Sequence, residues 1–234
     1  MLFDKLDDTS RGSTGVGGQW NIWDSTLNKY VLFLPTETLP SVVGSISTVD
    51  HDVTTSETVG KIKGKLSIED KEIQFLWHRD NLVRLNQFLN KQNDFLVSYP
   101  DGTGWKFTSE YVYKPDDSTS SEKVTGTINL ISSKVDSVAS LNVRDMMAPT
   151  CFITTTLDGE VEIEKSKSVS YTLTANADDV TYEVVSDNTG ITATETGGKL
   201  TITAGSGATT GIVELKANKT GMASWTTTIL VTVK

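Results

Sequence analysis

The pattern of hydrophobic and polar positions changes near residue 148. From there to residue 234 the chain is rich in Thr and poor in aromatic residues, and apolar and polar positions alternate in short stretches. Alternation is typical of strands, because successive side chains point to opposite faces of a sheet. Turn signals such as Gly197-Gly198 recur about every ten residues, the rhythm of an immunoglobulin-like (Ig-like) β-sandwich. Strands are expected at 152–157, 161–164, 168–174, 180–185, 191–195, 199–203, 211–217 and 225–233.

Residues 1–147 have a more mixed pattern, in which strand-like stretches surround one helical stretch. The helical stretch predicts a short amphipathic helix from Asn81 to Asn90, with Asp80 as its N-cap. Its apolar stripe, expected to pack against a sheet, consists of Leu82, Leu85, Phe88 and Leu89. Strands are expected at 20–24, 29–34, 42–49, 62–77, 95–99, 105–113 and 123–131.

The length of 234 residues favours two domains. Residues 1–147 are expected to form a β-sandwich or barrel-like domain with one short flanking α-helix, and residues 148–234 the Ig-like β-sandwich, so that the fold class is mainly β. Residues 1–19 contain few apolar groups and end in a Gly-rich run, which predicts a flexible arm. Residues 50–60 are polar and aperiodic, which predicts a long exposed loop.

Charge and cysteine content narrow the classes of protein. The net charge is −9, of which −5 lies in residues 1–147 and −4 in the rest. So acidic a chain is a poor candidate for binding the phosphates of nucleic acid. Cys151 is the single cysteine, which excludes an intrachain disulfide. No stretch has the roughly 18 apolar residues of a membrane span, and the first residues lack the apolar core of a signal peptide. Synthesis in a cytoplasm is therefore expected.

Candidate chemical sites are weak. His51 and His78, with one cysteine, do not match the spacing of metal ligands. The Gly-rich run 12–18 follows no strand and lacks the Lys of a phosphate loop. The acidic pairs 116–117 and 178–179 are interpreted as solvated turns. We therefore expect no enzyme, no catalytic, cofactor-binding or metal-binding residue, and no cofactor.

The predicted strand 105–113 has two different faces. Its aromatic face could be a platform on which bases stack, but core packing is favoured in so acidic a protein. This aromatic face consists of Trp105, Phe107, Tyr111 and Tyr113. The opposite face is polar and continues on the next strand.

The order of the expected elements from Ile73 to Asn129 is similar to that of a known protein family. A strand that ends in an aromatic residue (73–77) precedes the short helix, and a strand (95–99) leads to an Asp-Gly turn. An aromatic strand and a final strand (124–129) complete the order. This order resembles the major tail tube protein of long-tailed, non-contractile (siphovirus-type) bacteriophages, and the C-terminal Ig-like domain gives a lambda-like layout.

The resemblance implies a structural virion protein that polymerises as stacked hexameric rings into the phage tail tube, the conduit for DNA ejection. It implies the tape measure, tail terminator and distal tail or baseplate proteins as partners, and passage of DNA without specific binding. The arm 1–19 and the loop 50–60 are then expected to contact stacked rings, and the Ig-like domain to decorate the exterior and bind the host surface weakly. The virion would be assembled in the bacterial host cytoplasm.

The polar faces of the two strands 105–113 and 123–131 are candidates for the lumen of such a tube, or for its outer surface. The candidate lumen-facing residues are Lys106, Thr108, Glu110, Lys123, Thr125, Thr127 and Asn129. A different class of function also remains open, in which the Ig-like domain is a cell-surface or carbohydrate-binding adhesion module and residues 1–147 only present it.

Overall fold

The computed structural model describes residues 17–36, 38–42, 44–51, 60–100, 102–118, 123–136, 138–157, 159–187 and 189–234. For 44–51 and 60–67 it describes the backbone alone. Contacts divide the chain into two units. The first unit contains the described parts of Met1–Trp23, Phe33–Trp77 and Phe88–Met146. The second contains Asp24–Leu32, His78–Gln87 and Met147–Lys234, so it recruits two short segments from the first half of the sequence. The domain boundary at residue 147 stays a prediction.

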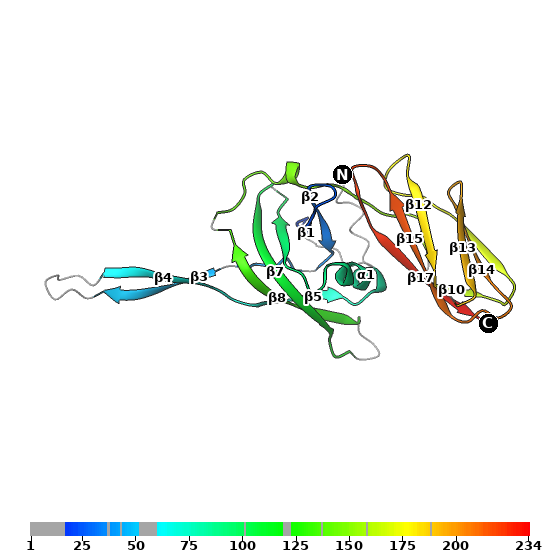
Figure 1. Cartoon of the computed structure of the whole chain (residues 1–234), viewed down its shortest axis with the longest axis horizontal. Helices are drawn as coiled ribbons and strands as arrows, with labels where there is room; N and C mark the ends of the chain where they lie inside the picture. Colours follow the sequence, from blue (N-terminus) through cyan, green and yellow to red (C-terminus); the bar gives the residue numbers. More distant parts are fainter. Residues whose placement is uncertain are drawn as a thin grey trace. The chain divides into compact units, whose positions relative to one another are not determined.

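A six-stranded sheet in the order β2-β1-β6-β7-β8-β5 dominates the first half of the chain (Figure 1). Every pairing with a determined register in this sheet is antiparallel, and the β7–β8 ladder shifts register between Thr108 and Ser109. Most expected strands are confirmed with small changes of boundary, but the expected strand 62–77 is divided at residues 69–70 into two strands. The strands are β1 (Gln19–Asp24), β2 (Lys29–Leu34), β5 (Lys71–Leu76), β6 (Asn93–Ser98), β7 (Gly104–Pro115) and β8 (Thr125–Val135).

One face of this sheet is an aromatic core. The Phe33 ring lies 4.7 Å from Trp20, 5.2 Å from Phe95 and 5.4 Å from Tyr111, measured between ring centroids. All four side chains are buried. Phe107 stacks on Phe95 at 5.2 Å. Edge-to-face and stacked ring pairs of this kind stabilise a core beyond the area that they bury. The interpretation of the aromatic face of β7 as core is therefore confirmed for Phe107 and Tyr111, whereas Trp105 and Tyr113 are half-buried.

Gly126 on β8 makes the close packing of two further rings possible. A Cβ atom at this position would lie 2.6 Å from an atom of Trp77 and 2.7 Å from an atom of Phe75. Those distances are shorter than any carbon–carbon contact between non-bonded atoms, so a side chain here would displace a ring. Phe75 is itself buried, on the sheet face that also carries the buried Ile73 and Ile128.

Strands β3 (Gly44–His51) and β4 (Gly60–Ile68) form a two-stranded antiparallel hairpin of their own, drawn clear of the six-stranded sheet in Figure 1. The expected loop 50–60 is wrong at its ends, because the ladder continues through the pairs Asp50–Lys61 and His51–Gly60. Backbone pairing does not require the apolar alternation that was missing there. Residues 52–59 lie outside the described residues, as do 1–16 of the expected arm. Gln19, its last residue, already belongs to β1.

Helix α1 (Arg79–Phe88) begins and ends two residues before the expected bounds. Asp80 is not the N-cap: it lies in the first turn, and its backbone N–H donates to Nδ1 of His78 at 3.4 Å. At the other end, Nδ2 of Asn93 donates to the carbonyl of Phe88 at 3.0 Å. The predicted stripe is correct in part. Leu85 is fully buried, and the Phe88 ring lies 6.3 Å from Phe33, whereas Leu82 and Leu89 are half-buried.

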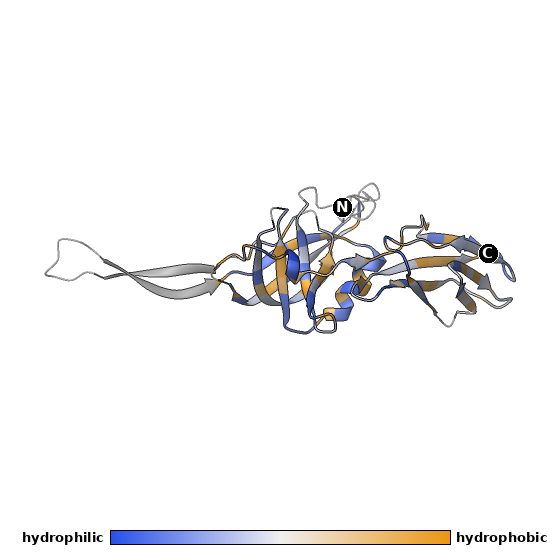
Figure 2. Cartoon of the chain, turned by 90° about the horizontal axis from the view of Figure 1, so that it is seen from above, coloured by the Kyte–Doolittle hydropathy of each residue, from blue (hydrophilic) through white to orange (hydrophobic). Residues whose placement is uncertain are grey.

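Residues 147–234 contain a β-sandwich, as expected from their alternation. One sheet has the order β10-β17-β15-β12 and the other β11-β14-β13. Figure 2 shows hydrophobic and hydrophilic residues interleaved along these strands. Side chains from both sheets share one core, in which Ile202, Leu200, Leu215 and Val231 are fully buried. The strands are β10 (Glu160–Ile163), β11 (Ser168–Thr172), β12 (Thr181–Ser186), β13 (Ile191–Thr196), β14 (Lys199–Ala204), β15 (Gly211–Asn218) and β17 (Thr226–Val233).

The expected strand 152–157 is wrong. In its place a short parallel ladder joins β9 (Thr150–Cys151) to β16 (Ala223–Ser224), and Ile153 makes a single bridge to Ala175. The segment before it contains a short 3-10 helix, η1 (Arg144–Met146). The fold class is confirmed: the chain is mainly β, with one short α-helix in its described part and an Ig-like sandwich at its C-terminal end.

Candidate functional site

The predicted lumen candidates lie on one sheet face, with one exception. Lys106, Thr108 and Glu110 lie on the face of β7 opposite to the aromatic core. The ladder pairs Val112 with Asn129 and Lys114 with Thr127, which places Asn129, Thr127 and Thr125 on the same face. Lys123 is exposed and precedes β8, so it lies outside the ladder. We call the side of β5, β6, β7 and β8 that carries these residues the polar face.

Several hydroxyls of the polar face are engaged within the chain. Thr127 donates to Oδ1 of Asp116 at 2.6 Å, and Thr125 donates to Oδ2 of the same carboxylate at 2.9 Å. Asp116 was expected to be a solvated turn residue, but it follows β7 directly and fixes the end of the β7–β8 hairpin. Thr108 donates to Oδ1 of Asp94 at 2.6 Å. Only 7% of Thr127 is exposed, whereas Glu110 on the same face is an exposed residue.

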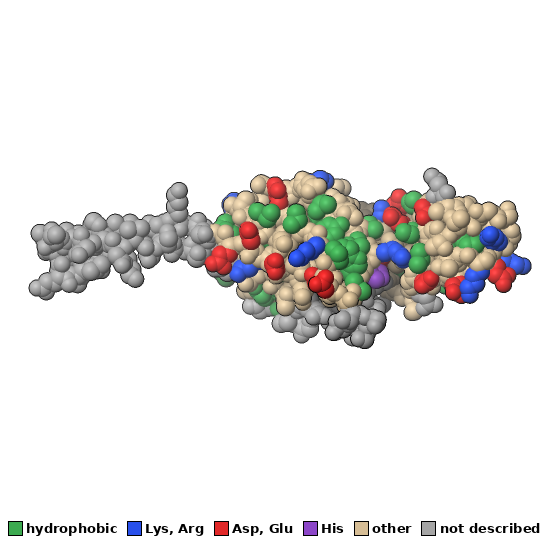
Figure 3. Space-filling model, turned by 90° about the horizontal axis from the view of Figure 1, so that it is seen from below, with side chains coloured by type: hydrophobic (Ala, Val, Ile, Leu, Met, Phe, Trp, Pro, Cys, Tyr) green, Lys and Arg blue, Asp and Glu red, His purple; other side chains and the backbone are tan. Residues whose placement is uncertain are grey.

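The polar face carries charges of both signs with one more carboxylate than ammonium groups, and two large apolar side chains lie among them. Val112 and Ile131 are 50% and 51% exposed. The strand registers and the bonds of Asp116 to Thr125 and Thr127 place four carboxylates and three ammonium groups on this face, so that it adds one negative charge. They are Glu72, Asp94, Glu110, Asp116, Lys106, Lys114 and Lys134. Acidic and basic side chains are likewise interspersed on the molecular face seen in Figure 3. Which way the polar face points in an assembly stays a prediction.

Strands β2 and β5 are the outer strands of the six-stranded sheet in the described part of the chain. The outer edge of a sheet strand presents backbone donors and acceptors on which another strand can add. The β3–β4 hairpin has two such edges, since its strands pair only with each other among the described strands. On β2 the carbonyls of Tyr30 and Leu32 already accept hydrogen bonds from Ala148 and Arg84. The edges on which a second chain could extend a sheet are therefore those of β5 and of the β3–β4 hairpin.

The second unit contains a polar joint between α1 and the Ig-like sandwich, which the sequence did not reveal. Oδ1 of Asp80 accepts hydrogen bonds from the backbone N–H of Thr228 at 2.8 Å and from its hydroxyl at 2.7 Å. Only 5% of Asp80 and 4% of Thr228 is exposed. Hydrogen bonds to a buried carboxylate are stronger than those between neutral groups. Asp80 is therefore a structural anchor of the helix on β17.

Arg84, one helical turn after Asp80, adds to this joint. Its guanidinium donates to the carbonyl of Leu32 at 2.8 Å and to Oε1 of Gln87 at 3.1 Å. The same group lies 5.9 Å from the ring centroid of Trp225, within the range of a cation–π contact. A spacing of four residues puts Asp80 and Arg84 on one helix face, a signal that was available, but charged residues on such a face are usually solvent-exposed.

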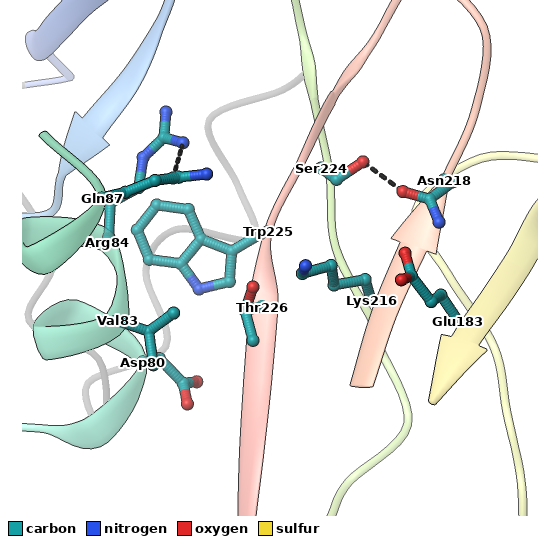
Figure 4. A pocket seen from close by; sticks show the side chains of 10 residues that line it. All are labelled: Asp80, Val83, Arg84, Gln87, Glu183, Lys216, Asn218, Ser224, Trp225 and Thr226. Carbon is teal, nitrogen blue, oxygen red and sulfur yellow. Dashed lines mark hydrogen bonds between the residues drawn. The ribbon is translucent and has the colours of Figure 1, made fainter. Parts of the chain in front are cut away.

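A cavity of about 190 Å³ opens beside this joint (Figure 4). One wall is α1, and the other is the outward face of the sandwich sheet. Its lining is mostly polar and contains two groups of each charge. The lining residues are Asp80, Val83, Arg84, Gln87, Glu183, Lys216, Asn218, Ser224, Trp225 and Thr226.

Other candidate chemistry stays sparse. The described residues contain no group of three or more His, Cys, Asp or Glu side chains that could hold a metal ion. In the described part of the chain, no helix is both long and apolar enough to cross a membrane. Cys151 is fully buried, and burial raises the pKa of its thiol more than nearby Lys219 lowers it. This thiol is therefore protonated near neutral pH and acts as a small apolar side chain.

No family model matches the chain, and no curated protein matches it. Among solved structures, the chain is similar to a chain of the anti-feeding prophage baseplate, a cryo-EM structure symmetrised six-fold. The identity is 9% and the TM-score 0.39, over 54% of this chain and 93% of that one. It is also similar to the tandem Ig repeats of Dlar, at 14% identity and a TM-score of 0.29, over 57% of this chain and 90% of that one. A likeness with a TM-score below 0.5 defines neither a shared function nor a shared assembly.

Proposed function

We propose that this chain is a structural virion protein that polymerises as stacked hexameric rings into the tail tube of a long-tailed, non-contractile bacteriophage. The tube would be the conduit for DNA ejection, and the Ig-like domain would decorate its exterior. The chain would be made and assembled in the bacterial host cytoplasm. Besides further copies of itself, its partners would be the tape measure, tail terminator and distal tail or baseplate proteins. The order of elements from Ile73 to Asn129 supports this proposal, since α1, β6, β7 and β8 follow in the expected sequence.

The β3–β4 hairpin is the observation that carries the proposal. Its strands span eight and nine residues and pair only with each other in the described part of the chain. A single two-stranded hairpin is marginally stable at best in water, because neither its faces nor its edges are supported. A neighbouring copy of the chain would supply the missing support. An element of this kind suits an assembling subunit better than a protein that works as a monomer.

The six-stranded sheet favours the same conclusion. Its outer strand β5 presents backbone groups at one edge, whereas on β2 the carbonyls of Tyr30 and Leu32 already accept hydrogen bonds from Ala148 and Arg84. A ring of identical subunits removes such edges, because each copy pairs with the next and the symmetry closes. Net charge is also compatible with a conduit, since −9 over the chain disfavours attachment to a passing duplex.

Negative-stain imaging of concentrated protein tests this function. The informative variant replaces residues 45–67 by a short Gly-Ser linker, which removes the hairpin and leaves every described ladder of the six-stranded sheet intact. The full chain is expected to form rings or tubes, and the variant compact monomers. The melting temperature of the variant is the control. If the variant does not assemble but melts at the same temperature as the full chain, the defect is due to loss of the hairpin and not to unfolding. Tubes formed equally by both proteins would refute this role of the hairpin.

A further inference from the structure

We propose that the cavity beside α1 is a binding site for a neutral, polyhydroxylated ring, a single sugar residue. The site lies in the second unit and goes beyond the proposed tube function, on which it does not depend. Three side chains carry it: Glu183 from β12, and Lys216 and Asn218 from β15. Figure 4 shows them on the side of the pocket away from α1, with Trp225 and Thr226 between them and the helix.

Glu183 and Lys216 are directly opposite in the β12–β15 ladder but are not engaged with each other. Residues so paired have Cβ atoms about 4.5–5.5 Å apart, so an ion pair would be easy to form. No ion pair joins Glu183 to Lys216, both of which the structure describes. Instead, Lys216 extends toward Trp225 and Thr226 (Figure 4). A donor and an acceptor of opposite charge are therefore both available to a ligand in the cavity.

Asn218 is oriented for donation. Its Oδ1 accepts a hydrogen bond from the hydroxyl of Ser224, which leaves the amide nitrogen to donate. A carboxylate, an ammonium group and an amide at the spacing of two adjacent strands match a ring with several hydroxyls, because each hydroxyl both donates and accepts. The deeper charged residues are already occupied, Asp80 by Thr228 and Arg84 by Leu32 and Gln87.

Size and charge restrict the ligand. The cavity of about 190 Å³ is far larger than the roughly 10–15 Å³ that one water requires. It is smaller than the roughly 300–1,000 Å³ of pockets that enclose drug-sized molecules, so it fits one ring and not a chain of rings. With Arg84 and Lys216 facing Asp80 and Glu183, the lining has no net charge. A neutral ligand is favoured over an anion such as phosphate.

Titration of the full-length chain, kept below its assembly concentration, tests the site. Neutral hexoses, N-acetylhexosamines and their disaccharides would be added singly while the side-chain amide signals of Asn218 and Gln87 are followed by NMR. Saturable shifts are expected, with dissociation constants on the order of 1 mM. Inorganic phosphate is the comparison ligand and is expected to cause none. A disaccharide that binds more tightly than its monosaccharide would identify the end of a glycan, and equal affinities would identify a free sugar.

Two variants keep the test decisive. Asn218→Ala and Lys216→Gln are expected to weaken binding at least tenfold, whereas Lys199→Gln on the other sheet is the matched control and should bind like the unmodified chain. Lys216→Gln does not touch the Asn218–Ser224 bond, so it reports on the site even if Asn218→Ala is misfolded. Tube formation should be unchanged in Lys216→Gln, which separates this site from the assembly function. The proposal would be overturned if no sugar caused saturable shifts, or if both variants showed the same shifts as the unmodified chain. The cavity would then hold water only.

Discussion

Asp80 and Thr228 are joined by two hydrogen bonds to a single carboxylate oxygen, at 2.8 and 2.7 Å, although 148 residues separate them in the chain. The contact ties a helix of the first half of the sequence to the last strand of the Ig-like sandwich. Both partners are almost completely buried, so water cannot replace either one in the folded chain. The joint fixes helix α1 to the sandwich within the second unit.

Asp80→Ala is expected to lower the free energy of unfolding by about 1–3 kcal/mol, because the N–H and hydroxyl of Thr228 would be left buried without an acceptor. Thermal and denaturant melts measure the loss. Asp117→Asn removes an exposed carboxylate and serves as the matched control, with no expected effect. Equal melting of Asp80→Ala and Asp117→Asn would show that the joint does not stabilise the fold.

Gly126→Ala is expected to cost about 1–3 kcal/mol, since its Cβ would overlap the rings of Trp77 and Phe75. Gly159→Ala is the control, because a Cβ there would meet no atom within 4 Å. At the size of this chain, a difference of 1 kcal/mol corresponds to roughly 2–4 °C in melting temperature. If Gly126→Ala melts at the same temperature as Gly159→Ala, the rings of Trp77 and Phe75 can move aside without cost.

Leu85→Ala should destabilise the chain by about 2–5 kcal/mol, because Leu85 is fully buried and its removal leaves a cavity. Leu141→Ala is the matched control, since Leu141 is 85% exposed and its truncation should cost little. Calorimetry compares the two. If Leu85→Ala melts normally but fails to assemble, this helix face belongs to a subunit interface instead.

Removal of residues 148–234 tests the predicted domain boundary. The shortened chain is expected to fold, because water can solvate Asp80 and Arg84 once the sandwich is absent, and to form tubes with reduced thermal stability. The full-length chain under the same conditions is the reference. A truncated chain that is soluble yet never polymerises would show that assembly requires the Ig-like unit.

The sequence predicted those parts of the fold that depend on local periodicity. The strands of the sandwich followed from alternation, and the burial of Leu85 from helical spacing. The β3–β4 ladder beyond Val49 was missed, because backbone pairing there continues through polar residues. The anchor at Asp80 was missed because its partner is 148 positions away and nothing local distinguishes a buried aspartate from an N-cap. Asp116 was misjudged for a related reason, since its acceptor role depends on Thr125 and Thr127 across a hairpin.

A charge reversal on the polar face tests whether this face lines the channel or the outer surface of an assembly. If this face lines the channel, Glu110→Lys is expected to leave assembly intact and to slow DNA ejection, most strongly at low salt, where screening of the added attraction is weakest. Lys123→Glu, at an exposed position outside the ladder, is the comparison variant. Unchanged ejection at every ionic strength would place Glu110 on the outside.

Helical reconstruction of assembled particles by cryo-EM tests the central claim most directly. The account predicts stacked six-membered rings around a bore wide enough for a duplex about 20 Å across, with the β3–β4 hairpin of each subunit ordered against a neighbouring copy and the Ig-like unit on the exterior. Monomers at every concentration, or fibres without a central bore, would contradict it.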